Sequence, residues 1–298
     1  MGLTETDIVS RYRENYGLST DISLSDIERH KQLEADLTNK LLNSTAENRW
    51  QTFHNCYSTL YESLPWLNVA GAGQSKARYD AWAALIKTPS RVFEVGSGAG
   101  HLIRHLAALG HQCAATEITA ERGKKHISDI AGIEWRITDG VNLAKFEQRE
   151  AYDVVISSQV IEHLHPDDVL CHFENVLLIL KPEGKYIFDT PHVGTGPHDL
   201  SKVFGLARPA FMHLREYDYR ELGRIAKLAG FREIQAVLFY ESGRITIGPY
   251  SSHLLFLYYC FVDSVISALR ISPARERSLR RFLRLALVPS GIWLVTQK

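Results

Sequence analysis

Cysteine is scarce in this sequence and shows no pairing pattern. The only four, Cys56, Cys113, Cys171 and Cys260, lie far apart, and none belongs to a CxxC pair. This spacing argues against a disulfide framework and a cysteine zinc site, and indicates a reducing compartment. Net charge is also absent, since 34 Lys and Arg residues balance 34 Asp and Glu residues among 298. A balanced chain does not favour a general binder of nucleic-acid backbones, which usually carries a basic excess.

Long apolar segments are missing too. The longest run, LLFLYYCFV at residues 254–262, ends at Asp263. A membrane-spanning helix needs about 20 apolar residues, so none is predicted. The first residues, MGLTETDIVSRYREN, are too polar for a signal peptide. With 45% apolar and 23% charged residues, the composition is that of a globular protein, and we expect it in the cytoplasm.

The first 75 residues carry a helical pattern. In residues 22–42 and 45–64, apolar side chains recur every three or four positions with charges between them. Pro65 closes this block, and the glycines of residues 71–73 indicate a linker. We therefore predict an N-terminal helical region over residues 1–75.

From residue 91 onward, short apolar runs alternate with helical patterns. Strands are predicted at residues 91–95, 112–117, 133–137, 153–158 and 185–190. Helices are predicted from about residue 100, after residue 117, from Pro166, and at residues 217–229. This alternation predicts an α/β fold with a doubly wound, mostly parallel sheet that binds ligands at the carboxyl ends of its strands.

The end of the chain adds two further strands and an insertion. Strands are predicted at residues 231–240 and 291–298. A structureless loop of the intervening length is improbable, so residues 250–288 are interpreted as two helices inserted in a hairpin. The predicted regions are therefore a core at 76–240, a helical insertion at 241–289 and a last core strand at 290–298.

A glycine-rich loop follows the first predicted strand, with the sequence EVGSGAG at residues 94–100. Glycines at such a junction let the backbone turn sharply and approach a ligand closely. The dinucleotide fingerprint G-x-G-x-x-G would require glycine at position 101, where the chain has His101. An NAD-dependent oxidoreductase is therefore the weakest interpretation.

Polar residues also follow the next three strands. Glu117 ends the second strand, where an acid can hold ribose hydroxyls. Asp139, in the sequence ITDG, follows the third strand and can accept a hydrogen bond from an exocyclic amine. Gln159, Glu162 and His163 follow the fourth strand, at the point where the strand order reverses.

Taken together, these stretches resemble the class I S-adenosylmethionine (SAM) dependent methyltransferases. The matching sequences are VFEVGSGAG, TE, TDG, SSQVIEHL and LKPEGKYIFDTPH, spread over roughly residues 76–240. The chain is most similar to the group that contains ubiquinone O-methyltransferases and many sugar and natural-product methyltransferases. The resemblance implies a seven-stranded Rossmann-like sheet of order 3-2-1-4-5-7-6, with strand seven antiparallel. It also implies SAM as cofactor and S-adenosylhomocysteine (SAH) as product.

The resemblance assigns a cofactor role to ten residues. The glycine loop would line the methionine part of SAM, and Glu94 would lie near its amino group. Glu117 would take both ribose hydroxyls, and the Asp139 turn would hold the adenine amine. Gln159 would lie by the SAM backbone, and Arg78, before the first strand, would pair with the carboxylate. The implied cofactor residues are Arg78, Glu94, Gly96, Ser97, Gly98, Gly100, Glu117, Asp139, Gly140 and Gln159.

Methyl transfer to a hydroxyl also needs a base. SAM is already activated, so the protein must align the nucleophile, exclude water and accept a proton, for which histidine is suited near neutral pH. His163 is the first candidate, because it follows the strand whose end would face the methyl group. His192, after the fifth strand, is the second candidate.

His213 is a third candidate, and it raises the question of a metal. Small-RNA 2′-O-methyltransferases place a metal in an E-x-x-E-H motif after strand four, with a later histidine. Glu162, His163 and His213 fit that pattern, but Gln159 replaces the first acid. A neutral amide is a poorer ligand for a hard divalent ion, so no metal is predicted. The favoured interpretation is that Glu162 and His213 fix the loop over the substrate.

The insertion contains an arginine-rich amphipathic helix. Its apolar stripe comprises Leu279, Phe282, Leu283, Ala286 and Leu287, and the other faces carry Arg277, Arg280, Arg281 and Arg284. We favour a helix that packs on its own protein or on a second subunit, as in a homodimer. The alternative is a peripheral contact of residues 270–288 with the inner membrane face. With the N-terminal helices, the insertion is expected to form the lid or wall of the acceptor pocket.

The sequence therefore predicts a methyltransferase that acts on a hydroxyl of a small or lipid-linked acceptor, such as a sugar, a quinone or a natural product. Three alternatives stay open. They are a metal-assisted RNA 2′-O-methyltransferase, which the zero net charge does not favour, an N- or C-methyltransferase of the same fold, and a SAM-binding protein without catalysis.

Overall fold

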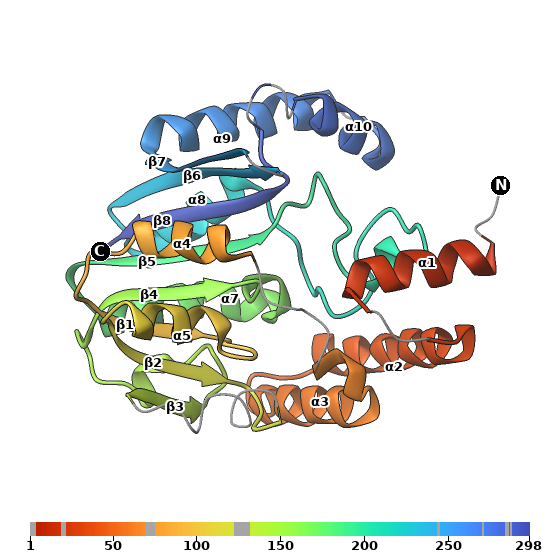
Figure 1. Cartoon of the computed structure of the whole chain (residues 1–298), viewed down its shortest axis with the longest axis horizontal. Coiled ribbons are helices and arrows are strands. Elements are labelled where there is room, and N and C mark those ends of the chain that lie inside the picture. Colours follow the sequence, from red (N-terminus) through yellow and green to blue (C-terminus); the bar gives the residue numbers. More distant parts are fainter. Residues whose placement is uncertain are drawn as a thin grey trace.

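A mixed sheet forms the centre of the computed structural model, which describes residues 4–18, 22–68, 75–121, 132–242, 245–269, 271–283, 286 and 288–298 (Figure 1). The eight strands of this sheet are β1 (Arg91–Val95), β2 (Gln112–Glu117), β3 (Ile133–Ile137), β4 (Tyr152–Ser158), β5 (Leu180–Pro191), β6 (Glu233–Ser242), β7 (Ile245–Ser252) and β8 (Gly291–Gln297). Their order is β3-β2-β1-β4-β5-β8-β6-β7.

Seven of these strands were predicted, and the eighth was not. The first three have the predicted bounds, and the predicted seventh strand corresponds to β8, antiparallel between β5 and β6. β7 adds an edge strand that pairs with β6, so the predicted seven-stranded sheet is incomplete. Its sequence contains Gly248-Pro249, which is typical of a turn, yet proline is tolerated in an edge strand.

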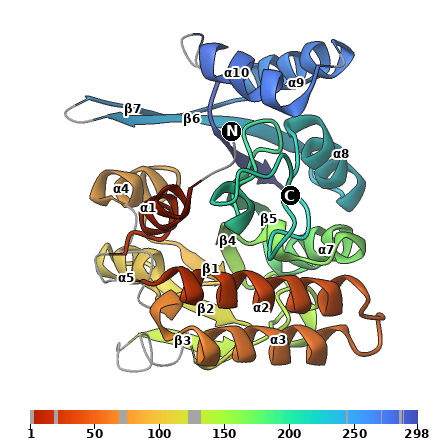
Figure 2. The same ribbon diagram turned by 90° about the vertical axis from the view of Figure 1, so that its right-hand side faces the viewer.

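Helices cover both faces of the sheet. One face packs against α4 (Lys76–Ala84) and α5 (His101–Ala108), with Trp82 and Leu106 in the core. The other face packs against α7 (Val169–Ile179), α8 (Tyr219–Ala229) and α9 (His253–Ala268). Figure 2 shows the two layers on opposite sides of the sheet. The central strands are buried on both faces, which explains their continuous apolar runs. Most of the helix predicted after residue 117 lies outside the described residues.

Three N-terminal helices lie beyond the carboxyl ends of the parallel strands (Figures 1 and 2). They are α1 (Glu5–Tyr16), α2 (Leu24–Leu42) and α3 (Arg49–Ser63). Capping boxes begin α1 and α2, at Thr4 with Asp7 and at Ser23 with Asp26. The apolar faces of α2 and α3 pack together and against Met212, which fixes them to the core. The predicted linker at residues 71–73 lies outside the described residues.

The insertion forms two helices, as predicted, but its arginine face is different. The second helix is α10 (Pro273–Leu283), and its Leu279 and Leu283 pack in a small core with Val262 of α9. Arg280 was predicted on an outer face, yet it is 3% exposed, and its Nη2 lies 2.7 Å from Oδ1 of Asp263. The predicted membrane-facing set is therefore wrong at Arg280, because a buried acid draws this side chain inward. Arg284 and Leu287 lie outside the described residues.

Among the described helices, none has the length and apolar character to span a membrane.

Candidate active site

A cavity of about 1050 Å³ lies where the parallel strands end. One side consists of the turns after β1 to β4, and the other of residues from the N-terminal helices together with residues 198–200, 212 and 213. No described residue between 241 and 289 lines this cavity, although Arg277 of α10 donates to the carbonyls of Gly196 and Ala207, on the segment that contributes residues 198–200 to the wall. The role of the insertion as lid or acceptor wall therefore stays a prediction. The hairpin of β6 and β7 holds the insertion against the far end of the sheet (Figure 1).

The glycine loop after β1 has a conformation that other residues rarely adopt. Gly96, Gly98 and Gly100 have φ angles of 68°, 54° and 72°, in the left-handed region. A Cβ atom at Gly96 would lie 2.6 Å from Cγ2 of Val160, so the loop also needs the space. Gly96 and Gly98 line the cavity, so the backbone itself faces whatever fills this part of it, whereas the predicted cofactor residue Gly100 does not line the cavity.

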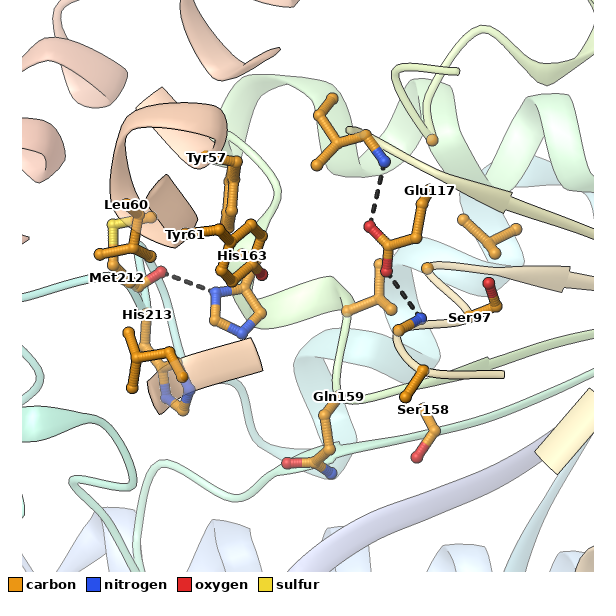
Figure 3. A pocket seen from close by; sticks show the side chains of 18 of the residues that line it. Tyr57, Leu60, Tyr61, Ser97, Glu117, Ser158, Gln159, His163, Met212 and His213 are labelled. Atoms are coloured by element: carbon orange, nitrogen blue, oxygen red, sulfur yellow. Dashed lines mark hydrogen bonds between the residues drawn. The ribbon is translucent and has the colours of Figure 1, made fainter. Parts of the chain in front are cut away.

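Glu117 holds the glycine loop in place. Its Oε1 accepts a hydrogen bond from Gly98 N at 2.7 Å, and its Oε2 accepts one from Ile118 N at 3.1 Å (Figure 3). The side chain lines the cavity and is mostly buried. Two backbone donors thus orient the carboxylate while it still has lone pairs for a ligand.

Glu94 lies on β1, the strand next to that of Glu117, and has fewer hydrogen-bond partners. Burial raises the pKa of its carboxyl to about 8, and the charge of Glu117 adds to the shift. Its Oε2 is buried and has no hydrogen-bond partner among the described residues. Ser97, on the glycine loop, has a buried hydroxyl of the same kind. Unpaired buried polar atoms are costly, which suggests that a ligand with donors completes this part of the cavity.

The turn after β3 is organised by its own acid. Asp139 Oδ1 accepts hydrogen bonds from Val141 N at 2.9 Å and Asn142 N at 2.8 Å, and its Oδ2 accepts one from the Asn142 side chain. Gly140 has a φ of 68°, and its carbonyl is hydrogen-bonded to the His172 ring. Asp139 and Gly140 both line the cavity. The carboxylate therefore shapes the turn first, and any ligand would share it.

Gln159 lines the cavity, whereas Arg78 does not. Gln159 has a φ of 57°, and its Nε2 donates to Asp189 Oδ2 at 3.0 Å. Arg78 Nη2 donates to the same oxygen at 2.6 Å, and its guanidinium lies over the Trp293 ring. Asp189, which the sequence interpretation missed, thus connects the two predicted residues. The available signal was its position at the carboxyl end of β5.

His163 lies in the cavity wall, in the short 3₁₀ helix η3 (Ile161–His163) after β4. Its Nδ1 lies 2.9 Å from the carbonyl oxygen of Met212, so in the neutral ring Nδ1 carries the proton and Nε2 the lone pair (Figure 3). The ring stands edge-on to Tyr57 and His213. The histidine is therefore held in one orientation and in the tautomer that a base needs.

His213 lies beside His163 and is surrounded by acids. Its Nδ1 lies 2.9 Å from Oε1 of Glu216. Burial would lower the pKa of the ring, but this hydrogen bond and the charges of Glu162 and Asp199 outweigh burial and raise the pKa. His213 also lines the cavity.

Glu162, His163 and His213 meet at one point, with one donor atom from each within 4.8 Å of the others. Burial raises the pKa of Glu162 to about 7, and its Oε2 accepts a hydrogen bond from Thr190. One carboxylate and two imidazoles could hold a divalent ion. Gln159 adds no carboxylate to this set, and its amide nitrogen is engaged with Asp189.

His192 is not at the cavity, so its selection as the second catalytic candidate is wrong. The side chain is fully buried at the end of β5. Its Nδ1 accepts a hydrogen bond from Gly194 N at 2.9 Å, and its Nε2 lies 3.1 Å from Asp263 Oδ1. Both ring nitrogens thus make structural contacts, and the side chain links the end of β5 to α9.

The far wall of the cavity carried no sequence motif. Its residues come from helices and loops that are distant in sequence, and only their packing brings them together. They are Glu14, Tyr16, Glu34, Phe53, Tyr57, Leu60, Tyr61, Leu67, Asp199 and Met212. No lysine or arginine occurs among the described residues that line the cavity.

A known protein family matches the segment that forms the strand-end side of the cavity. The profile of a family described as "Methyltransferase domain" matches residues 73–236, more than half of the chain. Among curated protein sequences, no significant match was found.

Solved structures share the fold at low sequence identity. A SAM-dependent methyltransferase from Archaeoglobus fulgidus has a TM-score of 0.52 at 16% identity, covering 81% of this chain and 99% of that one. A 1,6-didemethyltoxoflavin-N1-methyltransferase from Burkholderia thailandensis, solved with its substrate and SAH, has a TM-score of 0.52 at 13% identity, covering 86% and 91%. Phosphoethanolamine N-methyltransferase 2 from Haemonchus contortus, in complex with SAH, has a TM-score of 0.50 at 16% identity, covering 85% and 60%.

Proposed function

This chain belongs to the methyltransferase-domain family and is SAM-dependent, and we propose that it methylates a hydroxyl of a small or lipid-linked acceptor with His163 as general base. When bound, SAM supplies a methyl group that its sulfonium has already activated. The protein residues then have to bind the cofactor, orient the acceptor hydroxyl, exclude water and accept one proton.

The strand-end side of the cavity suits SAM. Gly96 and Gly98 line the cavity without side chains, so the backbone there can approach the methionine part of a ligand. The unpaired Oε2 of Glu94 can accept from its ammonium, and the oriented carboxylate of Glu117 from two ribose hydroxyls. The Asp139 turn would lie against the adenine. Through Asp189, Arg78 would position Gln159 rather than bind the carboxylate of SAM itself.

The main support for hydroxyl methylation is the hydrogen bond between His163 Nδ1 and Met212 O. In the neutral ring this hydrogen bond places the proton on Nδ1 and the lone pair on Nε2, on the wall between the glycine-loop side and the N-terminal helices (Figure 3). A hydroxyl nucleophile must lose a proton during transfer, and a base within hydrogen-bond reach provides for this. Tyr57 and Leu60 of α3 cover the same region and would exclude water from it.

The test is a transfer assay with radiolabelled SAM against lipid, sugar and RNA fractions. His163→Ala should lower turnover by roughly 10²–10⁴-fold, because the base is lost, while SAH affinity measured by calorimetry changes little. His253→Ala is the matched control, since the His253 ring also contacts a backbone carbonyl but lies on α9, outside the cavity. Full activity of His163→Ala would contradict the role of His163, and SAH binding without transfer to any fraction would favour a non-catalytic SAM-binding protein.

A second candidate function rests on the convergence of Glu162, His163 and His213. If these residues held a divalent ion, the ion could assist transfer to an RNA 2′-hydroxyl. The cavity lining opposes an RNA substrate, because it offers no described lysine or arginine to phosphate groups. We expect activity to survive EDTA. Activity lost to EDTA and restored by Mn²⁺ would establish the metal-assisted alternative instead.

A further inference from the structure

A buried chain of hydrogen bonds connects α1 and α2 to the cavity. Trp66 Nε1 donates to the Tyr12 hydroxyl at 2.9 Å, and this hydroxyl lies 2.7 Å from Nδ1 of His30. His30 Nε2 lies 2.8 Å from Oε1 of Glu34, one turn further along α2. Tyr12 and His30 are fully buried, and Glu34 is 5% exposed. Four side chains thus form one line of contacts that ends at a cavity-lining carboxylate.

The direction of this chain follows from the donors at its start. An indole nitrogen can only donate, so the Tyr12 oxygen accepts from Trp66 and its own proton goes to His30. Burial raises the pKa of Tyr12, which keeps that proton in place. A neutral His30 accepts at Nδ1 and donates from Nε2, which makes Glu34 the final acceptor. The arrangement therefore orients the Glu34 carboxyl group, with Oε1 facing His30.

The second carboxylate oxygen of Glu34 takes no part in this chain of hydrogen bonds. Glu34 Oε2 is buried and has no hydrogen-bond partner among the described residues. An unpaired buried carboxylate oxygen is costly, so a site that retains one is complete only when a donor reaches it. Asp199, another acid on this wall, differs because backbone N–H donors already occupy both of its oxygens. Glu34 is therefore the acid on the N-terminal wall that is prepared for a ligand.

The surroundings define the charge of that ligand. The cavity lining contains six carboxylates and no lysine or arginine among the described residues. An anionic acceptor would be repelled and would leave its charge unpaired, whereas a cation would be attracted. The rings of Phe53, Tyr57 and Tyr61 line the same cavity, and the faces of aromatic rings attract cations.

There is room for such an acceptor beside the cofactor. Single small-molecule sites usually occupy about 300–1,000 Å³. The cavity measures about 1050 Å³ and extends from the glycine loop to α2, so it can hold two molecules. Glu34 lies outside the segment that matches the family profile, residues 73–236, so the family match does not assign it a role.

We propose that Glu34 is the specificity-determining residue for the acceptor and binds a protonated amine on it. The acceptor would then carry a hydroxyl for methylation and, elsewhere, an amine that Glu34 and the aromatic rings recognise. The hydroxyl part of this inference rests on the proposed hydroxyl methylation, whereas the amine part does not. The recognition of the amine can be measured by binding alone, without turnover.

The experiment uses two matched sets of probes on the full chain saturated with SAH. The first set is tyramine, 4-(2-hydroxyethyl)phenol and 3-(4-hydroxyphenyl)propionate, and the second is glucosamine, glucose and glucuronate. Within each set the members share hydroxyl groups and differ in an amine, neutral or acidic group. In at least one set, calorimetry should show the amine bound roughly 10- to 100-fold more tightly than its neutral partner, and the acid most weakly.

Variants separate recognition from folding. Glu34→Gln, which keeps the shape but loses the charge, should bring the amine-to-neutral affinity ratio close to one. Glu28→Gln is the control, because Glu28 lies on the same helix but is exposed and paired with Lys31. If Glu34→Gln does not fold, as judged by its melting curve, Glu34→Asp provides the same comparison, since the shortened side chain should lower the ratio.

The proposal is overturned if no amine in either set outcompetes its neutral partner, or if the Glu34 variant that folds keeps the wild-type ratio. In that case the chain of hydrogen bonds serves only to join α1 to α2. Failure of hydroxyl methylation has a different signature, in which the amines bind with the expected preference but accept no methyl group from SAM. The two proposals can thus fail separately.

Discussion

Glu117 and Glu94 are buried carboxylates of the same cavity with different functions. Glu117 is fixed by two backbone donors, one of them on the glycine loop. We expect Glu117→Ala to weaken SAH binding by roughly 1.5–3 kcal/mol, because hydrogen bonds to a charged group are lost and the loop loses its anchor. Calorimetry measures the effect, with Glu134→Ala on the exposed edge strand β3 as control. An unchanged affinity would remove Glu117 from the cofactor site.

Glu94 should make cofactor binding depend on pH. With a pKa of about 8, it is mostly neutral at pH 7, whereas a nearby ammonium favours the ionised form. SAH binding should therefore release a proton, and the affinity should rise with pH up to about pH 8 and then level off. Calorimetry in buffers of different ionisation enthalpy measures the released proton. Glu94→Gln should abolish this release, and its persistence would show that another group titrates.

The same pKa shift has the opposite effect on the stability of the free protein. The native state holds the Glu94 proton more tightly than the unfolded chain, so this contribution is fully present below the unfolded pKa of about 4.5. It is lost as the pH rises through about 8. Urea denaturation should show a shallower decline of stability over this range in Glu94→Gln.

The helices and strands differ in how much the sequence revealed. β1, β2 and β3 were predicted to the residue. β1 and β2 are buried parallel strands, which give short apolar runs between clear turns, and the edge strand β3 alternates apolar and charged residues in the sequence IEWRI. β7 was missed, because half-exposed edge strands lack such a run and this one contains Gly248-Pro249. The amphipathic pattern of α10 predicted the packing of Leu279 and Leu283, but Phe282 of the same predicted stripe is 69% exposed. The pattern could not tell that Asp263, on another helix, would bury Arg280 as well.

The residues of the candidate site also differ in how far the sequence revealed them. The glycine loop, Glu117, Asp139, Gln159 and His163 were found because each follows a strand end, and strand ends of parallel sheets meet. Glu34 and Tyr57 were not found, because their place in the cavity depends on how α2 and α3 pack against the segment around Met212. His192 also follows a strand end, yet it turns toward α9, so position alone does not decide direction.

The attachment of α9 and α10 depends on one buried acid. Asp263 accepts hydrogen bonds from Arg280 at 2.7 Å and from Tyr219 N at 2.9 Å, and contacts His192. Asp263→Asn should lower the free energy of unfolding by about 3–5 kcal/mol, because the arginine charge stays buried without its partner. Urea denaturation measures this, and the exposed pair of Glu28 with Lys31 provides a control, Glu28→Gln, with an effect below about 1 kcal/mol. A comparable effect in both variants would contradict the importance of the buried pair.

Lowering the pH should cause part of the same loss of stability as Asp263→Asn. Burial alone would raise the pKa of Asp263, but its contacts with His192 and Arg280 outweigh burial and lower the pKa. A lowered native pKa gives stability that is present above the unfolded value, 3.8, and is lost as the pH falls through the native value. Asp263→Asn should therefore be less sensitive to acid than the wild type.

The chain as a whole has two separate attachments to one sheet. The N-terminal helices lie over the carboxyl ends of the strands and complete the cavity, whereas α9 and α10 lie over the edge formed by β6 and β7 (Figures 1 and 2). The segment that matches the family profile, residues 73–236, lies between them in sequence. If the proposals above hold, cofactor binding and acceptor recognition come from different parts of the chain, and the acceptor wall could then change without altering the cofactor site.

Hydrogen exchange should make this division visible. At about 100 times its dissociation constant, SAH stabilises the bound state by about 2.7 kcal/mol, so exchange that requires opening of the site slows by roughly 100-fold. Mass spectrometry should find this protection in residues 94–102, 116–118, 138–140 and 158–160, which line the cavity. Residues 253–283, which include α9 and α10, should exchange at the same rate with and without SAH, because they are outside the cavity. In Glu117→Ala at the same SAH concentration, protection of the cavity segments should decrease, which serves as the control for specific binding. Protection of α9 and α10 on addition of SAH would instead mean that the insertion closes over the cofactor, as a lid does.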